Sequence, residues 1–162
     1  MNKSTSNADA NEAKAPPVKT AAATKPARNP IDVMQARSAQ RFAQIIGVMM
    51  RDATFKKLQL GELEWLVLPP LLANQCSVGF ATRATADGKP ETGGPAMPVA
   101  MALWARVSPN IDKLLTENLD KSFRLKAQDW TSGDILWLVA TAGDKRVLPH
   151  FIKQLREKDF KG

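Results

Sequence analysis

Four residues of this chain combine a side chain suited to nucleophilic or proton-transfer chemistry with a distinctive place in the sequence. The sequence contains one cysteine, Cys76, and one histidine, His150. A cysteine is able to hold an acyl group as a thioester, and a histidine is able to move a proton. Ser132 and Asp134 stand in a short polar stretch, residues 129–134, directly before an apolar run. These four residues are the candidates for catalysis.

Each candidate also has a structural interpretation, which the sequence favours. Cys76 lies in a predicted strand with no neighbour in sequence that would lower the pKa of its thiol, so a core position is expected. His150 follows a proline at the start of the last predicted helix, where a histidine is more often a surface residue than a catalytic base. Asp134 stands at a polar–apolar boundary where burial would perturb it, but Asp134 and Ser132 also suit hydrogen bonds to the backbone of their own turn.

Composition excludes several kinds of site. One cysteine and one histidine rule out a Cys/His zinc site within one chain, and no other metal site is expected. A lone cysteine forms no intrachain disulfide, which fits a reducing cytoplasm. No apolar run approaches the roughly 18 residues of a membrane span, and the N-terminus lacks the hydrophobic region of a signal peptide. We therefore expect a cytoplasmic protein without a transmembrane segment.

The charge of the chain favours an acidic partner. The formal net charge is +7 and the sequence pI is about 9.8. Such a surface attracts nucleic acid, anionic lipid or an acidic protein, and charge alone does not choose among them. The sequence has no helix-turn-helix signature, no aromatic-rich platform and no tyrosine, so no nucleic-acid partner is expected.

The chain divides into a tail and one domain. Residues 1–30 are rich in Ala, Lys and Pro and contain almost no large apolar side chain, so they predict a disordered tail. Residues 31–162 form the predicted domain. It begins with a helix for which Asp32 is a suitable cap, and the helical spacing of the following apolar residues predicts one buried stripe: Phe42, Ile45, Ile46, Met49 and Met50.

The remaining elements predict an α+β fold. A helix over 60–72 should end or kink at Leu68, because two prolines follow it. Strands are expected over 76–81, 99–107 and 134–140, with a long polar connection over 82–97. Ser108 and Pro109 predict the start of a short helix, and a last helix is expected over 147–158. Helices beside a small, mainly antiparallel sheet are typical of the α+β class.

Four stretches of the chain resemble one known family, in that family's order. They are LEWLVLPPLLANQ (63–75), PVAMALWARVS (98–108), DWTSGDILWLV (129–139), and Gly143-Asp144 with the last helix. The chain resembles the toxin-activating lysine acyltransferases, the partners of RTX haemolysins and cyclolysins. The resemblance covers roughly residues 35–160.

The resemblance implies a GNAT-like acyltransferase fold and a homodimer. Members of this family move a fatty acyl group from acyl carrier protein to internal lysines of an RTX protein. The donor substrate would be acyl-acyl carrier protein, with no bound cofactor. Acyl carrier protein is strongly acidic, which fits the net charge of +7. The glycine-containing acetyl-CoA loop of other GNAT enzymes is absent from the sequence.

The sequence departs from the family where a general base is needed. In the family a histidine takes the proton of the attacking lysine, and an aspartate assists it. The histidine position falls on Phe55, followed by Lys56 at a basic position, and the aspartate falls at or beside Ala140. Neither phenylalanine nor alanine transfers a proton. Two hypotheses follow: a divergent acyltransferase, or a catalytically inactive relative that acts as a binding partner or chaperone module.

The substrate-binding candidates are Lys56, Trp104 and Trp137. The two tryptophans lie on strands that we expect to be neighbours in the sheet and would suit the wall of an acyl-chain groove, where each buried methylene contributes about 0.8 kcal/mol. The alternative for both tryptophans is an ordinary core position.

Overall fold

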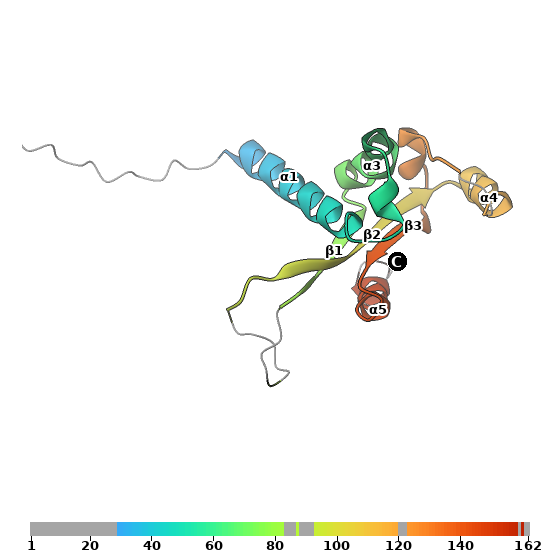
Figure 1. Ribbon diagram of the computed structural model, residues 1–162. Helices are drawn as coiled ribbons and strands as arrows, with labels where there is room; N and C mark the ends of the chain where they lie inside the picture. The colour runs from blue at the N-terminus through green and yellow to red at the C-terminus, as the bar shows by residue number, and fades with distance from the viewer. Residues whose placement is uncertain (1–28, 83–86, 88–92, 120–122, 159, 161–162) are drawn as a thin grey trace, which may run out of the picture.

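A three-stranded antiparallel sheet with helices on both faces forms the centre of the protein (Figure 1). The computed structural model describes residues 29–82, 87, 93–119, 123–158 and 160. The strands are β1 (Cys76–Ala81), β2 (Met97–Val107) and β3 (Ile135–Gly143), with β2 in the middle. The helices are α1 (Pro30–Met49), α2 (Leu63–Leu66), α3 (Leu68–Leu72), α4 (Pro109–Glu117) and α5 (Leu148–Lys158). The predicted α+β class is confirmed.

Helix α1 is longer than predicted. Its cap is Asn29, whose side chain accepts a hydrogen bond from the Ile31 N–H, and Pro30 occupies the first helical position. Asp32 lies in the first turn, so the prediction that it caps the helix was wrong. The C-terminal half of α1 buries Ile45, Val48 and Met49, whereas Met50, which was assigned to the buried stripe, is 69% exposed.

The predicted break at Leu68 is confirmed. Helix α2 ends at Leu66 and α3 begins at Leu68. Proline at the second and third positions of α3 removes backbone donors that a continuous helix would need. Asn74, with φ of 55°, then turns the chain into β1. The kink lets the two short helices pack beside α1 over one face of the sheet (Figure 1).

Strand β2 contributes to two cores because its side chains alternate between the faces of the sheet. Met101, Leu103, Ala105 and Val107 join the larger core, which also contains residues of α1, α2 and the 3₁₀ helix Ala127–Trp130. Ala100, Ala102 and Trp104 face α5 and pack with Phe151 and Leu155. The central strand is therefore covered on both faces.

Strand β3 extends beyond its predicted end. The prediction stopped at Ala140, but pairing with β2 continues to Gly143. Leu103 pairs with Ala140 and Trp104 pairs with Leu138, so Val139 is an extra residue in β3. A bulge of this kind preserves pairing on both sides while it shifts the alternation of side chains.

Two predictions fall wholly or largely outside the described residues. The tail lies almost entirely in residues 1–28, and much of the connection between β1 and β2 lies in 83–86 and 88–92. Over the residues that the structure describes, no helix is both long and apolar enough to cross a membrane.

Candidate functional site

The polar stretch 129–134 is a local turn, here called the knot, that is hydrogen-bonded to the end of β2. Ser132 Oγ accepts a hydrogen bond from the Ser108 N–H at 2.9 Å and donates to the Asp129 carbonyl oxygen at 3.0 Å. The Gly133 N–H donates to the Arg106 carbonyl oxygen at 3.2 Å. Trp130 is fully buried in the larger core. The knot therefore anchors the chain before β3 begins.

The close approach of the knot to β2 requires glycine at position 133. A Cβ there would lie 2.5 Å from the Val107 carbonyl oxygen and 2.6 Å from Ser108 Cα, distances that real Cβ atoms do not show. Asp134, the next residue, is exposed, and its side chain makes no hydrogen bond to any residue the structure describes. Around Ser132 the geometry is that of a structural turn.

The other two catalytic candidates lie apart from the knot. His150 is exposed on α5, with its Nε2 3.0 Å from Gln154 Nε2. Cys76 is buried in β1, and this burial raises the pKa of its thiol, while Arg41 acts in the opposite direction. The structure brings neither residue together with Ser132 or Asp134.

The two tryptophan candidates lie on neighbouring strands but on opposite faces of the sheet. Trp104 faces α5 and packs edge-to-face against Phe160, with ring centroids 5.3 Å apart. Trp137 packs against the larger core, and its indole Nε1 donates to Asp112 Oδ1 at 2.6 Å. The pair does not line one groove. Lys56 is exposed in the 3₁₀ helix Phe55–Lys57.

A cavity of about 590 Å³ opens where α1 ends, β2 begins and β3 ends. We call it the α1–β3 cavity. It contains two carboxylates and two cations among its lining residues, which are Val48, Arg51, Asp52, Ala53, Thr54, Val99, Gly143, Asp144 and Lys145. The Arg51 guanidinium donates to the carbonyl oxygen of Pro98, which ties the end of α1 to the start of β2.

Gly143 lines this cavity, and the backbone conformation and close packing at its position require glycine. Its φ is +141°, and a Cβ on it would collide with the Val99 carbonyl oxygen and with Ala100. The Asp144 N–H donates to that same Val99 oxygen at 3.0 Å. The end of β3 is thereby pressed closely against the start of β2.

The two carboxylates of the cavity differ in their partners. Asp144 accepts hydrogen bonds from Arg146 Nε at 3.1 Å and Nη2 at 2.8 Å, and from the Arg146 backbone N–H at 2.9 Å. These bonds lower the pKa of Asp144 to about 2, so it is a fixed anion and a poor proton acceptor at neutral pH. Asp52 Oδ1 accepts from the Thr54 N–H at 2.8 Å and the Phe55 N–H at 3.4 Å. No cationic side chain in the described residues pairs with Asp52.

Two carboxylates of the cavity lie close in sequence to the positions where the resemblance led us to expect a base and an acid, although neither of those positions lines the cavity. Phe55 itself packs against the larger core and Ala140 is buried in it. Asp52 comes three residues before Phe55, and Asp144 comes four residues after Ala140. Neither aspartate was a candidate from the sequence.

The described residues contain no group of three or more His, Cys, Asp or Glu side chains arranged to hold a metal ion. A comparison with family models finds a match to the RTX toxin acyltransferase family over residues 34–162. The chain belongs to the RTX toxin acyltransferase family. The match runs from the first turns of α1 through the knot to α5 and includes the whole α1–β3 cavity. No curated protein matches the chain.

The family assignment confirms the resemblance found in the sequence. The general activity of the RTX toxin acyltransferase family is acyl transfer to RTX toxins. The α1–β3 cavity brings Asp52 and Asp144 together with Arg51 and Lys145 inside the part of the chain that the family model matches.

Proposed function

We propose that this chain transfers a fatty acyl group from acyl carrier protein to lysine side chains of an RTX-type protein, and that the reaction takes place in the α1–β3 cavity. The observation that carries the proposal is the position of Asp52, which lines the cavity beside the residue that replaces the family's histidine. The reaction needs no bound cofactor because the carrier brings the acyl group as a thioester. We place the reaction in the cytoplasm.

The chemistry requires one proton acceptor. The lysine ammonium first gives one proton to water, the neutral nitrogen then forms a bond to the thioester carbonyl carbon, and the bond between that carbon and sulfur breaks. The nitrogen must lose a proton during this exchange. Asp52 accepts that proton and passes it to the departing thiolate, so the products are an amide and a free carrier thiol.

Asp52 is oriented for this role by its own backbone contacts. Hydrogen bonds from the Thr54 and Phe55 N–H groups fix Oδ1. No hydrogen bond from the described residues reaches Oδ2, which leaves that oxygen available to an entering amine. Arg146 neutralises Asp144 through their ion pair, and Arg51 and Lys145 also line the cavity, so Asp52 is the carboxylate that remains to pair with an entering amine.

Basic residues on α1 support an acidic carrier as the donor. Arg37 and Arg41 line a cleft of about 420 Å³ between α1 and α3, together with Leu71, Leu72 and Asn74. Arg41 is hydrogen-bonded to Asn74 Oδ1 at 2.5 Å. Neither arginine forms an ion pair in the described part of the chain. Such a surface attracts a strongly acidic protein.

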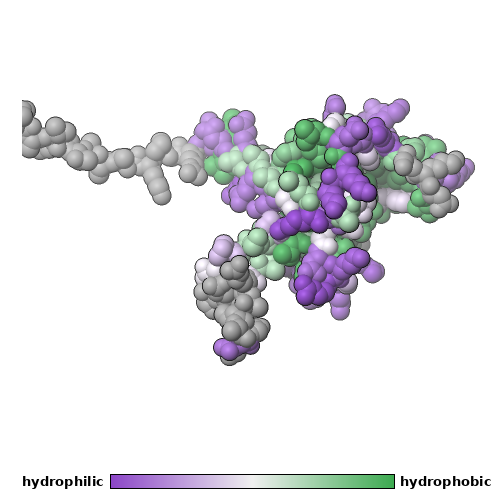
Figure 2. Space-filling model, in the orientation of Figure 1, coloured by the Kyte–Doolittle hydropathy of each residue, from purple (hydrophilic) through white to green (hydrophobic). Residues whose placement is uncertain are grey.

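Exposed apolar side chains outside the Arg37–Arg41 cleft suit the homodimer that the resemblance implies. Ile31 and Leu68 do not line that cleft and are 61% and 39% exposed. Figure 2 shows hydrophobic surface over α3 and a mixture of hydrophobic and hydrophilic surface over the start of α1. Light scattering that gives twice the chain mass would support the dimer, and a monomer at micromolar concentration would contradict it.

One assay tests the proposed transfer. The full chain is incubated with long-chain acyl-acyl carrier protein and the RTX-type protein encoded beside it, and the acceptor is digested and analysed by mass spectrometry. We expect a mass increase of one acyl group on specific lysines, with none when the chain is omitted. Carrier binding without lysine modification would instead identify the inactive relative, a binding partner or chaperone module.

A further inference from the structure

The direction of the hydrogen bonds in β2 shows which backbone groups of β3 are free. The Trp104 N–H donates to the Gln75 carbonyl oxygen, and the Arg106 carbonyl oxygen accepts from the Gly133 N–H. Both bonds lie on the β1 side of β2. Because successive residues of a strand direct their backbone groups to opposite sides, Leu103, Ala105 and Val107 face β3. Ala105 pairs with Trp137 and Val107 with Ile135.

Strand β3 therefore has an open outer edge. Leu136 and Leu138 pair with Arg106 and Trp104, whose backbone groups point the other way, so their own N–H and C=O groups point away from β2. Beyond the bulge, the Asp144 N–H donates to the Val99 carbonyl oxygen, so Asp144 and Ala142 direct their backbone groups toward β2. The backbone groups of Thr141 alternate with these and point away from β2. These outward groups have no backbone partner among the described residues. An open edge of this kind accepts an additional strand.

The outer edge of β3 leads directly to the α1–β3 cavity. Gly143, Asp144 and Lys145 continue the strand and line the cavity. Along the edge the side chains are uncharged, and Ile135 and Leu138 are 37% and 39% exposed. A chain segment bound at this edge would reach Asp52 and Asp144 at its end.

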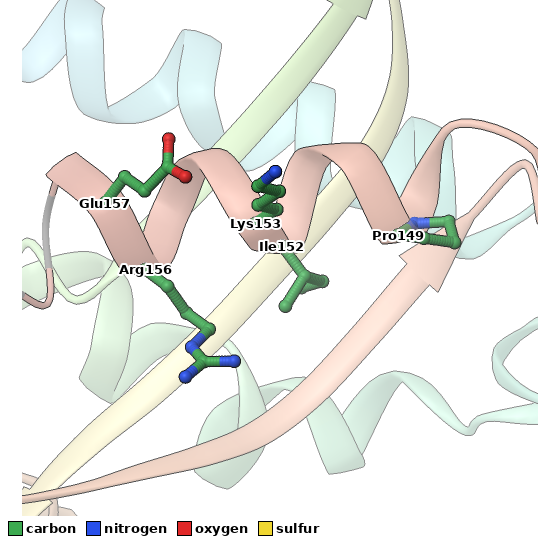
Figure 3. Close-up of a pocket in the computed structure, with 5 residues that line it drawn as sticks. All are labelled: Pro149, Ile152, Lys153, Arg156 and Glu157. Atoms are coloured by element: carbon green, nitrogen blue, oxygen red, sulfur yellow. The ribbon is translucent and has the colours of Figure 1, made fainter.

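A groove beside α5 offers room for the side chains of such a segment. It has a volume of about 550 Å³ and its lining includes Pro149, Ile152 and Arg156. Figure 3 shows Ile152 and Arg156 extending from α5 on the side along which β3 runs. Ile152 and Leu136 pack against the same core. Every second side chain of an added strand would point toward this face.

We propose that the acceptor protein binds as an extended, lysine-bearing segment that adds a strand to the outer edge of β3 and delivers its lysine to the α1–β3 cavity. The inference rests on the proposed function for the identity of the occupant. Main-chain hydrogen bonds supply affinity in this mode, and alternate side chains supply specificity. Asp52, which pairs with no cationic side chain among the described residues, offers the lysine nitrogen a carboxylate partner in the cavity. The uncharged edge suits β-branched and apolar residues beside that lysine.

Hydrogen exchange measured by NMR tests this binding without any need for catalysis. The probe is a nine-residue peptide of alternating threonine and valine with a central lysine. At saturating peptide, we expect the amides of Leu136, Leu138 and Thr141 to exchange about tenfold more slowly or slower still, because each gains a hydrogen bond. The amides of Trp137 and Ala142, already bonded to β2, should change little. Unchanged exchange at all three outward amides with millimolar peptide overturns the proposal.

A matched pair of proline variants tests the same edge in the acylation assay. Leu138→Pro removes an outward N–H without removing a bond to β2, which edge strands tolerate. The control, Val78→Pro, makes the same change on the outer edge of β1. We expect Leu138→Pro to lower lysine acylation at least tenfold and Val78→Pro to preserve it. Equal rates for two folded variants would contradict the proposal.

The two arms separate this inference from the proposed function. Amide protection by the peptide without acylation would retain the binding mode and reject the activity. Acylation without protection would retain the activity and reject the binding mode. Where Leu138→Pro fails to fold by circular dichroism, the exchange measurement on the unaltered chain decides.

Discussion

Asp52 and Asp144 line the same cavity from two segments far apart in the sequence, but Arg146 holds only Asp144. The guanidinium and backbone N–H of Arg146 fix one carboxylate as an anion. Among the described residues, the Asp52 carboxylate accepts hydrogen bonds only from backbone N–H groups of its own turn. The proposed reaction therefore assigns proton transfer to Asp52 and not to Asp144.

The pairing of Asp144 with Arg146 predicts a titration at unusually low pH. The pKa of Asp144 falls from 3.8 to about 2, chiefly through hydrogen bonds from Arg146. Because the folded-state pKa is the lower one, the pair stabilises the fold fully above pH 4, and this contribution is lost as the pH falls to about 2. Carbon NMR of the Asp144 carboxyl should show a midpoint near 2.

The variant Arg146→Ala is the control for that titration. It removes the guanidinium and keeps the backbone N–H, so the midpoint should rise part of the way toward 3.8. A midpoint near 3.8 in the unaltered chain would contradict the described contacts.

Ser132→Ala should affect stability and leave acylation unchanged. The Ser132 hydroxyl bridges the Ser108 N–H and the Asp129 carbonyl oxygen and does not line the cavity. Loss of these hydrogen bonds should lower the free energy of unfolding by about 1 kcal/mol. Urea denaturation measures this change, and a large loss of acyl transfer in the folded variant would restore Ser132 as a catalytic candidate.

Gly133→Ala should destabilise the fold strongly for its size. The new methyl group would meet the backbone of Val107 and Ser108 at 2.5–2.6 Å, and overpacking of this kind typically costs about 1–3 kcal/mol. Gly61→Ala is the matched control because nothing lies within 4 Å of a Cβ there. Its effect on the free energy of unfolding should stay within about 0.5 kcal/mol. Equal effects at the two positions would show that the knot does not approach β2 as described.

Hydrophobic periodicity and proline positions were sufficient to predict the elements of this fold. The presence of α1, the break at Leu68 and the cap at Ser108 all depend on local sequence, and each is confirmed, although Met50 of the predicted buried stripe is exposed. The end of β3 was missed because its last residues, Thr141 to Gly143, carry no strong strand preference and are held by pairing with β2. The helix start was misplaced because Asn29 competes with Asp32 as a cap.

The candidate site was harder to predict because it depends on tertiary contacts. The resemblance pointed to Phe55 and Ala140, and no local pattern marked Asp52. Asp52 and Asp144 line one cavity because Arg51 ties the end of α1 to the start of β2, and Gly143 lets the end of β3 lie against the same part of β2. Trp104 and Trp137 lie on opposite faces of the sheet because of the register of β3 against β2. No local sequence pattern specifies that register.

Single-turnover acyl transfer by the Asp52→Asn variant tests the central claim most directly. Asparagine keeps an oxygen to accept from the Thr54 and Phe55 N–H groups, so the turn is preserved while proton acceptance is lost. Asp134→Asn, which changes an exposed carboxylate outside the cavity, is the control. We predict that Asp52→Asn lowers the rate of lysine acylation by about 10²–10⁴-fold, the usual contribution of a general base, and that Asp134→Asn retains the original rate. Equal rates in the two folded variants would contradict the assignment of Asp52 as the base.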